Sequence, residues 1–127
     1  MKIAVTTAPF GNPDPTPRKQ LQGLDVEYNT IDREMNSCEL ASMLSKIQPD
    51  IIIAGTEKYT PEILALDPNL KLIARVGVGL DSVDLEECKK RNIIVTFTPT
   101  APSNAVAELT IAQMIIALRH VQNVDLL

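Results

Sequence analysis

The stretch Asp50–Ala54, with the sequence DIIIA, places three isoleucines in a row and shows no alternation between apolar and polar positions. A short strand that is apolar on both faces is typical of a parallel sheet with helices packed on each side. Further runs of this kind lie at Lys2–Thr6, Leu70–Ala74 and Ile93–Phe97, and a weaker one lies at Val26–Thr30. Helical segments separate the five runs, so the sequence predicts an α/β fold with a doubly wound, five-stranded parallel sheet.

The main helices between these strands begin at recognisable capping residues. Asn36 stands three residues before Glu39, which is the spacing of a capping box. Thr60 precedes Pro61, a residue that is favoured in the first turn of a helix. Asp84 is expected to cap the next helix with its side chain.

The first connection of the chain is a loop rich in proline. Ala8–Pro17 contains four of the nine prolines, and a short helix is expected after it, over Arg18–Leu24. Proline has no backbone N–H to donate, so this loop is a poor cradle for the phosphate of a flavin. It also lacks the clustered acids that a phosphate-accepting regulatory domain needs.

The last segment differs from the other helices. A long helix is expected from Ser103 toward the end of the chain, after Pro99 and Pro102, and apolar residues lie almost all round it. Such a helix needs cover on more than one side. We therefore expect residues 1–100 to form a domain and residues 101–127 to lead into a part of a larger protein that this chain lacks. A central helix of a small domain and a dimer contact are the alternatives, and we expect the chain to self-associate through this helix.

Composition excludes several classes of partner. The net charge is −4, the acids and bases are interspersed, and aromatic residues make up 3% of the chain, which argues against nucleic acid. No apolar run approaches the roughly 18 residues of a membrane span. The two cysteines are far apart and no secretion signal precedes them, so a cytoplasmic protein with reduced thiols is expected.

The stretch Arg75–Asp81, RVGVGLD, follows a predicted strand and raises the question of a nucleotide-binding loop. A dinucleotide fingerprint needs a third glycine, which is absent here, and the carboxylates of Asp81 and Asp84 would repel a pyrophosphate. Glycines at the end of a parallel strand also allow backbone N–H groups to hold a small carboxylate. An ordinary tight turn is the alternative.

The sequence LKLIARVGVGLDSVDLEECKKRNIIVTFTPTAPSNAVAELTIAQMIIALRHV closely resembles the D-isomer-specific 2-hydroxyacid dehydrogenases, especially their phosphoglycerate-dehydrogenase-like branch. The resemblance runs from about Ile51 to Val121. It implies that residues 1–100 form a flavodoxin-like substrate-binding domain and that the long helix crosses to a Rossmann domain absent from this chain. It also implies NAD or NADP as the cofactor of the full-length enzyme, with none bound to this chain alone.

The resemblance also assigns substrate-binding roles. It implies that the backbone N–H groups of Val78 and Gly79 hold the substrate carboxylate, and that Arg75 contacts a distal phosphate, with a surface ion pair as the alternative for Arg75. Relatives that act on 3-phosphoglycerate often carry an arginine after the third strand. Here that turn brings Glu57, which has the wrong charge for a phosphate, and Lys58 is the candidate substitute.

The function expected from the resemblance is the substrate-binding part of an NAD(P)-dependent oxidoreductase that acts on the CH–OH group of a D-2-hydroxy acid, with 3-phosphoglycerate as one candidate. The partner is a small 2-hydroxy or 2-oxo carboxylate, and a homodimer is implied. The catalytic arginine, acid and histidine of the family lie on the Rossmann side, so no catalytic, cofactor-binding or metal-binding residue is expected in this chain, which should be inactive alone. His120 is read as a helix-surface residue. A stand-alone flavodoxin-like ligand-binding or regulatory module is the alternative.

Overall fold

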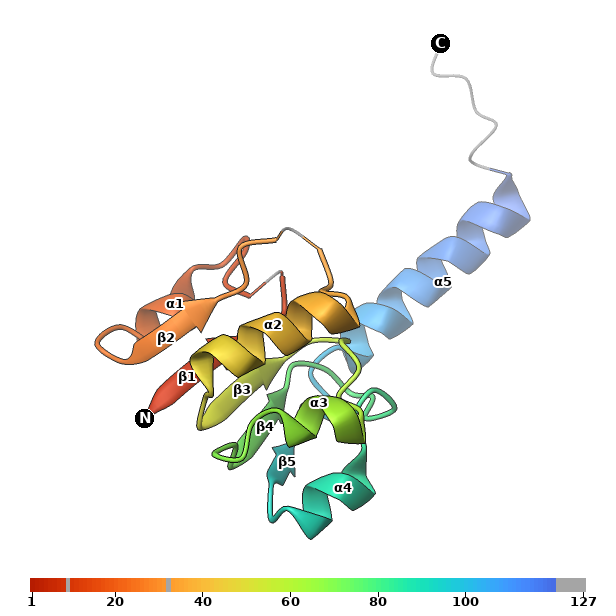
Figure 1. Cartoon of the computed structure of the whole chain (residues 1–127). Coiled ribbons are helices and arrows are strands. Elements are labelled where there is room, and N and C mark those ends of the chain that lie inside the picture. Colours follow the sequence, from red (N-terminus) through yellow and green to blue (C-terminus); the bar gives the residue numbers. More distant parts are fainter. Residues whose placement is uncertain (9, 32, 121–127) are drawn as a thin grey trace.

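The computed structural model describes residues 1–8, 10–31 and 33–120, in which strands and helices alternate along the chain (Figure 1). The strands are β1 (Lys2–Val5), β2 (Asp25–Tyr28), β3 (Ile51–Ala54), β4 (Leu72–Arg75) and β5 (Ile94–Thr96). The helices are α1 (Thr16–Gln20), α2 (Ser37–Ile47), α3 (Pro61–Ala65), α4 (Leu85–Lys90) and α5 (Ser103–Arg119).

The strands form one sheet in the order β2-β1-β3-β4-β5, and all neighbours run parallel. This is the flavodoxin-like strand order, and it confirms the predicted five-stranded parallel sheet. The order reverses direction between β1 and β3. Loops that leave the carboxyl ends of these two strands diverge, and ligands of open α/β sheets bind at such a point.

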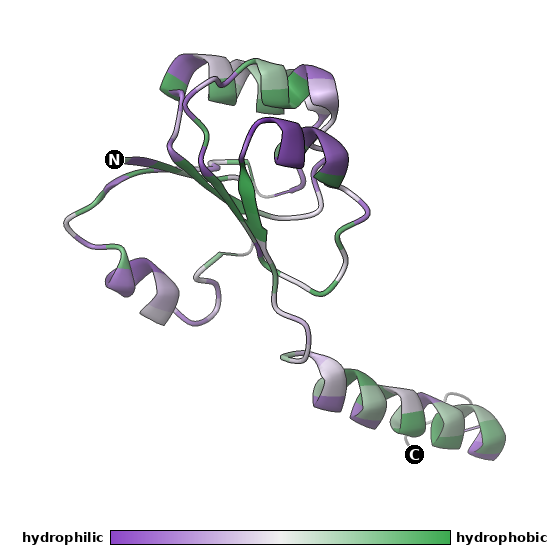
Figure 2. Ribbon diagram, turned by 90° about the horizontal axis from the view of Figure 1, so that it is seen from below, coloured by the Kyte–Doolittle hydropathy of each residue, from purple (hydrophilic) through white to green (hydrophobic). Residues whose placement is uncertain are grey.

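Helices lie on both faces of the sheet, but unequally (Figure 2). α2, α3 and α4 pack side by side over one face, and α1 lies on the other. The burial of β3 follows this difference, because Ile52 and Ala54 are fully buried whereas Ile51 and Ile53 are half-buried. The core therefore sits between the sheet and the three helices. Its largest enclosed apolar side chains are Leu40, Leu44, Ile52, Tyr59, Leu64 and Ile73.

The predicted starts of α2, α3 and α4 are confirmed, whereas the helix expected at Arg18–Leu24 spans Thr16–Gln20. The Asn36 side chain accepts the N–H groups of Cys38 and Glu39, and Glu39 accepts the N–H of Asn36 at 2.9 Å, which completes the capping box of α2. Thr60 caps α3 with Pro61 in its first turn. At α4, the Asp84 side chain accepts the N–H of Glu87 at 2.8 Å.

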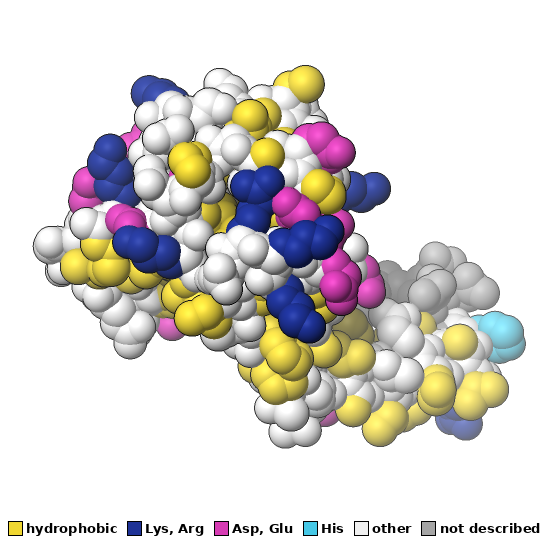
Figure 3. All heavy atoms as spheres, turned by 60° about the horizontal axis from the view of Figure 1, so that its bottom comes forward, with side chains coloured by type: hydrophobic (Ala, Val, Ile, Leu, Met, Phe, Trp, Pro, Cys, Tyr) yellow, Lys and Arg dark blue, Asp and Glu magenta, His cyan; other side chains and the backbone are white. Residues whose placement is uncertain are grey.

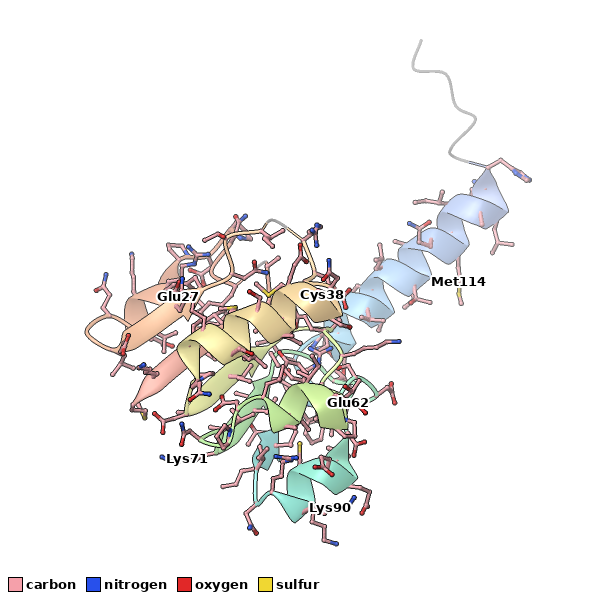
Figure 4. The ribbon with its side chains drawn as sticks, viewed as in Figure 1. Glu27, Cys38, Glu62, Lys71, Lys90 and Met114 are labelled. Carbon is pink, nitrogen blue, oxygen red and sulfur yellow. The ribbon has the colours of Figure 1, made fainter. Side chains whose placement is uncertain are left out.

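Helix α5 projects away from the sheet (Figure 1), and none of its residues is buried. Apolar side chains are spread along its surface (Figure 3), and Met114 is an example that points outward (Figure 4). The most exposed is Leu118, with 79% of its surface accessible. The start at Ser103 agrees with the prediction, and the part of the expected helix beyond residue 120 lies outside the described residues. Within residues 1–8, 10–31 and 33–120, no helix combines the length and apolar character needed to cross a membrane.

Candidate functional site

A hollow of about 240 Å³ lies at the sheet edge where β1, β3 and β4 end, beside the point at which the strand order reverses. A larger hollow, of about 440 Å³, lies between β2 and α2, but its lining contains neither a glycine loop nor a residue of β1, β3 or β4. We therefore take the smaller hollow as the candidate site. It is lined by Thr7, Ala8, Glu34, Gly55, Thr56, Glu57, Arg75 and Val76.

Gly77, which directly follows this lining, is required by the fold. Its φ is 142°, a conformation that residues with a side chain rarely adopt. A Cβ atom at Gly77 would also lie 2.6 Å from Nη1 of Arg75. Its N–H donates to Oγ1 of Thr98 at 2.9 Å, so this N–H is not available to a ligand.

Gly79 is different, because neither its backbone nor its neighbours demand a glycine. Its φ is not in the left-handed region, and a Cβ atom would meet only Oδ2 of Asp81, at an ordinary contact distance of 3.6 Å. The N–H groups of Val78 and Gly79 donate to no acceptor among the described residues. Both residues are exposed. The loop thus presents adjacent unpaired donors, with open space where a side chain at Gly79 would stand.

Arg75 joins the glycine loop to the hollow. Its guanidinium lies against Gly77, and Nη1 donates to the carbonyl oxygen of Val76. Nε is enclosed and has no hydrogen-bond partner among the described residues. Arg75 takes part in no salt bridge within the described chain, so the surface ion pair considered for it is not observed there.

Glu57 is the buried acid of the site, with 1% of its surface accessible. Oε2 accepts the N–H of Gly55 at 2.9 Å and lies 3.2 Å from the hydroxyl of Thr6. That hydroxyl in turn lies 2.7 Å from the hydroxyl of Tyr59. Burial raises the pKa of Tyr59, against the opposing effect of its hydrogen bond with Thr6. The phenol therefore stays neutral and acts as a hydrogen-bonding group.

Lys58 does not join the other predicted site residues. Its side chain is exposed and lines a separate depression beside the start of α2, together with Glu34, Met35, Asn36 and Ser37. The structure thus brings Arg75 next to the loop of Val78 and Gly79 and leaves Lys58 outside the hollow. A role for Lys58 in substrate binding stays a prediction.

The glycine loop after β4 does not fit a dinucleotide. The loop of Gly77 and Gly79 is followed by Asp81, and the short helix after it is capped by the carboxylate of Asp84, so a pyrophosphate would meet negative charge. No group of three or more histidine, cysteine, aspartate or glutamate side chains is placed to bind a metal ion within the described parts of the chain. What the site can do chemically is to bind a small anion through backbone N–H groups, with one guanidinium beside them.

The chain is similar to several known proteins. The hydroxypyruvate reductase of Thermotoga maritima is 38% identical over 81 residues, which are 61% of this chain and 26% of that protein. The D-3-phosphoglycerate dehydrogenase of Archaeoglobus fulgidus is 33% identical over 103 residues, which are 81% of this chain and 19% of that protein. The solved structure of D-lactate dehydrogenase from Aquifex aeolicus, complexed with NAD and lactic acid, matches with a TM-score of 0.73 and 27% identity, covering 97% of this chain and 36% of that chain.

The chain therefore spans well under half the length of the curated relatives that it matches. The family model described as D-isomer specific 2-hydroxyacid dehydrogenase, catalytic domain, matches residues 3–124, which is nearly the whole chain. The parallel sheet, its strand order and the glycine loop after β4 agree with that match. The chain belongs to the family of D-isomer specific 2-hydroxyacid dehydrogenases.

Proposed function

We propose that this chain is the substrate-binding part of an NAD(P)-dependent dehydrogenase that acts on the CH–OH group of a small D-2-hydroxy acid. The observation that carries the proposal is the pair of unpaired N–H groups at Val78 and Gly79. They stand beyond the carboxyl end of β4 and directly follow Gly77, against which the guanidinium of Arg75 lies. Backbone N–H groups and a guanidinium both stabilise a carboxylate through charge-assisted hydrogen bonds.

In this proposal the residues of the chain bind and orient the acid. The N–H groups of Val78 and Gly79 donate to the carboxylate, and Arg75 offsets its charge from the side of the hollow. The rest of the acid then extends toward the hollow, whose wall includes Gly55 and Glu57. A bound nicotinamide would supply the hydride acceptor. Holding the carboxylate fixes the position of C2, which loses the hydride while its hydroxyl oxygen loses the proton.

The cofactor-binding and proton-transfer parts are proposed to lie outside this chain. The relatives are several times longer than the region matched here, and α5 carries apolar side chains that no described residue covers. We infer that residues 1–100 are the substrate-binding domain and that residues 101–127 lead into an NAD-binding domain. A cytoplasmic, homodimeric enzyme is part of the same proposal.

Calorimetry with D-lactate tests the binding role on this chain alone. Gly79→Ala places a methyl group in the open space beside the unpaired donors and should weaken binding about tenfold, because hydrogen bonds to a charged group contribute about 1.5–3 kcal/mol. Both variants keep their N–H groups, but Val78→Ala adds no atoms beside the donors, so it is the matched control and should bind as the unchanged chain does. Equal affinity in all three proteins would contradict the proposed cradle.

The catalytic part of the proposal is tested on the complete protein that carries this chain. We expect it to consume NADH or NADPH with small 2-oxo acids and to form the D-isomer of the product. This chain alone should neither catalyse the reaction nor bind NAD with micromolar affinity. A complete protein that consumes neither cofactor with any 2-oxo acid would support a ligand-binding module instead.

A further inference from the structure

We propose that Glu57 determines the substrate specificity of the hollow: its carboxylate excludes phosphorylated acids and binds a hydroxyl group on the third carbon of a small 2-hydroxy or 2-oxo acid. This inference rests on the proposed function, because it assumes that the acid is anchored by its carboxylate at Val78 and Gly79. It adds which chemical group the hollow binds at the other end of the acid, on its third carbon.

The position of Glu57 is fixed by groups that directly follow two neighbouring strands. Oε2 accepts the N–H of Gly55, which directly follows β3, and faces the hydroxyl of Thr6, which directly follows β1. A Cβ atom at Gly55 would lie 2.9 Å from Oε2 and 3.0 Å from Oε1, so the carboxylate occupies the space that a side chain there would need. Glu57 is therefore a fixed part of the wall.

The hydroxyl groups around Glu57 form a directed chain. Thr6 has a single hydroxyl proton, and its Oγ1 lies 2.7 Å from the hydroxyl of Tyr59 and 3.2 Å from Oε2 of Glu57. The carbonyl oxygen of Ile53, 3.3 Å from Oγ1, is a second acceptor for this proton. When Thr6 donates to Glu57, Tyr59 donates to Thr6, and both protons point toward the carboxylate. Thr6 and Tyr59 are fully buried, so this arrangement has no competition from solvent.

The second oxygen of Glu57 remains free for a ligand. Among the described residues no donor bonds to Oε1, although only 1% of the surface of Glu57 is accessible. Oε1 is also not one of the fully enclosed atoms without a partner, and Glu57 lines the hollow. Oε1 therefore stays accessible from the hollow, where water pairs with it when no ligand is bound. In this proposal a donor group of the substrate takes the place of that water.

The charges around the hollow decide which donor that is. A phosphate group carries about −1.5 to −2 charges and only acceptor oxygens when ionised, so it would meet repulsion and no donor at Glu57. Arg75, the cation of this wall, is assigned to the carboxylate end of the acid in the proposed function. Glu34 also lines the hollow, but its carboxylate is exposed and screened by solvent, and Lys58 lines the adjoining depression. An ammonium group would meet Arg75, which already supplies a positive charge to this wall. A neutral hydroxyl satisfies Oε1 without either conflict.

Three acids that differ only at the third carbon test the proposal: D-lactate, D-glycerate and 3-phospho-D-glycerate. Their affinities are measured from the backbone amide signals of the isotope-labelled chain by nuclear magnetic resonance. We expect D-glycerate to bind about tenfold more tightly than D-lactate, because it adds a hydrogen bond to a buried charge. The phosphorylated acid should bind at least tenfold more weakly than D-glycerate.

Glu57→Gln is the decisive variant, because glutamine keeps the size of the side chain and an acceptor for Gly55 while removing the charge. It should lower the affinity ratio of D-glycerate to the phosphorylated acid at least tenfold. Glu34→Gln removes an exposed charge from the same hollow and should change that ratio less than threefold, because solvent screens it. A merely structural role of Glu57 would change all three affinities together and leave the ratio unchanged.

The outcomes separate the two proposals. If no acid shifts the amide signals of Val78 and Gly79, the carboxylate cradle is wrong and the specificity assignment falls with it. If the cradle signals shift but D-glycerate binds no more tightly than D-lactate, or the phosphorylated acid binds as tightly as D-glycerate, the role of Glu57 alone is overturned. Should Glu57→Gln fail to fold, the ranking of the three acids by the unchanged chain still decides.

Discussion

The guanidinium of Arg75 occupies the space in which a side chain at Gly77 would have to lie, since an added Cβ would stand 2.6 Å from Nη1. A side chain at Gly77 would move the end of the flexible Arg75 side chain, and the φ of 142° at Gly77 itself favours glycine. The glycine allows the guanidinium to lie against the loop, and the guanidinium links the loop to the hollow beside it. Gly79, two residues further on, has no such neighbour.

Gly77→Ala should destabilise the chain by about 1–3 kcal/mol, because alanine is strained at a φ of 142°. It should also displace Arg75 and weaken acid binding. Gly79→Ala is the matched control and should change the free energy of unfolding by about 0.5 kcal/mol or less. Urea denaturation of the two variants checks the prediction, and equal losses would show that the two glycines do not differ in this way.

The chain should lose stability in acid through the pair formed by Arg33 and Glu39. The hydrogen bond from Arg33 at 2.6 Å, followed by the backbone N–H of Asn36, lowers the pKa of Glu39 from 4.5 to about 2. A depressed carboxyl pKa stabilises the fold above the unfolded value near 4.5, and this contribution is lost as the pH falls through about 2. Solvent screens the exposed pair, so the effect is small.

Arg33→Gln should raise the pKa of Glu39 toward its ordinary value and move the midpoint of acid unfolding to higher pH. Lys19→Gln is the control, since Lys19 forms no salt bridge with another described residue. Circular dichroism between pH 6 and about pH 2 follows the transition. An unchanged midpoint in Arg33→Gln would show that the pair contributes nothing measurable.

Leucines in the core and on α5 should respond very differently to truncation. Leu64 is fully buried, whereas 61% of Leu109 is exposed. Leu64→Ala should cost about 2–5 kcal/mol because it leaves a cavity. Leu109→Ala should change the free energy of unfolding by about 0.5 kcal/mol or less at low protein concentration. A large loss from Leu109→Ala would mean that α5 is packed against the domain in solution.

Self-association through α5 should be measurable by light scattering. Ile115 is 54% exposed, and burying such a side chain against a second copy contributes roughly 1.5–3 kcal/mol. Ile115→Glu should therefore shift a dimer toward the monomer, and Ile116→Glu should act in the same direction. Leu24→Glu, which changes an exposed leucine outside α5, should leave the mass unchanged. A monomer at high concentration, or a dimer indifferent to these charges on α5, would remove this helix as the interface.

Local signals were sufficient to predict most of the elements. The capping box of Asn36 and Glu39 depends on a spacing of three residues, so the sequence predicts it directly. The short helix expected at Arg18–Leu24 instead spans Thr16–Gln20, because Pro17 belongs to its first turn and Asp14 accepts the N–H of Thr16. Glu87 has the spacing of a capping box, but its carboxylate pairs with Arg91 at 2.7 Å.

The part of the site that sequence reasoning missed depends on contacts between distant segments. The wrong charge of Glu57 for a phosphate is visible in the sequence, but its burial is not. That burial depends on Thr6 and Gly55, which two parallel strands bring together. Lys58 stands next to Glu57 in the chain and yet lines a different depression. The sequence signal that could have indicated this burial is that Thr6 and Gly55 stand at the ends of two predicted strands, β1 and β3, which are neighbours in the sheet.

A crystal structure of this chain with D-glycerate tests the central claim most directly. The account predicts that the carboxylate oxygens lie within about 2.7–3.2 Å of the backbone nitrogens of Val78 and Gly79. The rest of the acid should point toward Arg75 and the hollow. A carboxylate bound elsewhere, for example between β2 and α2, with the N–H groups of Val78 and Gly79 still unpaired, would contradict the account.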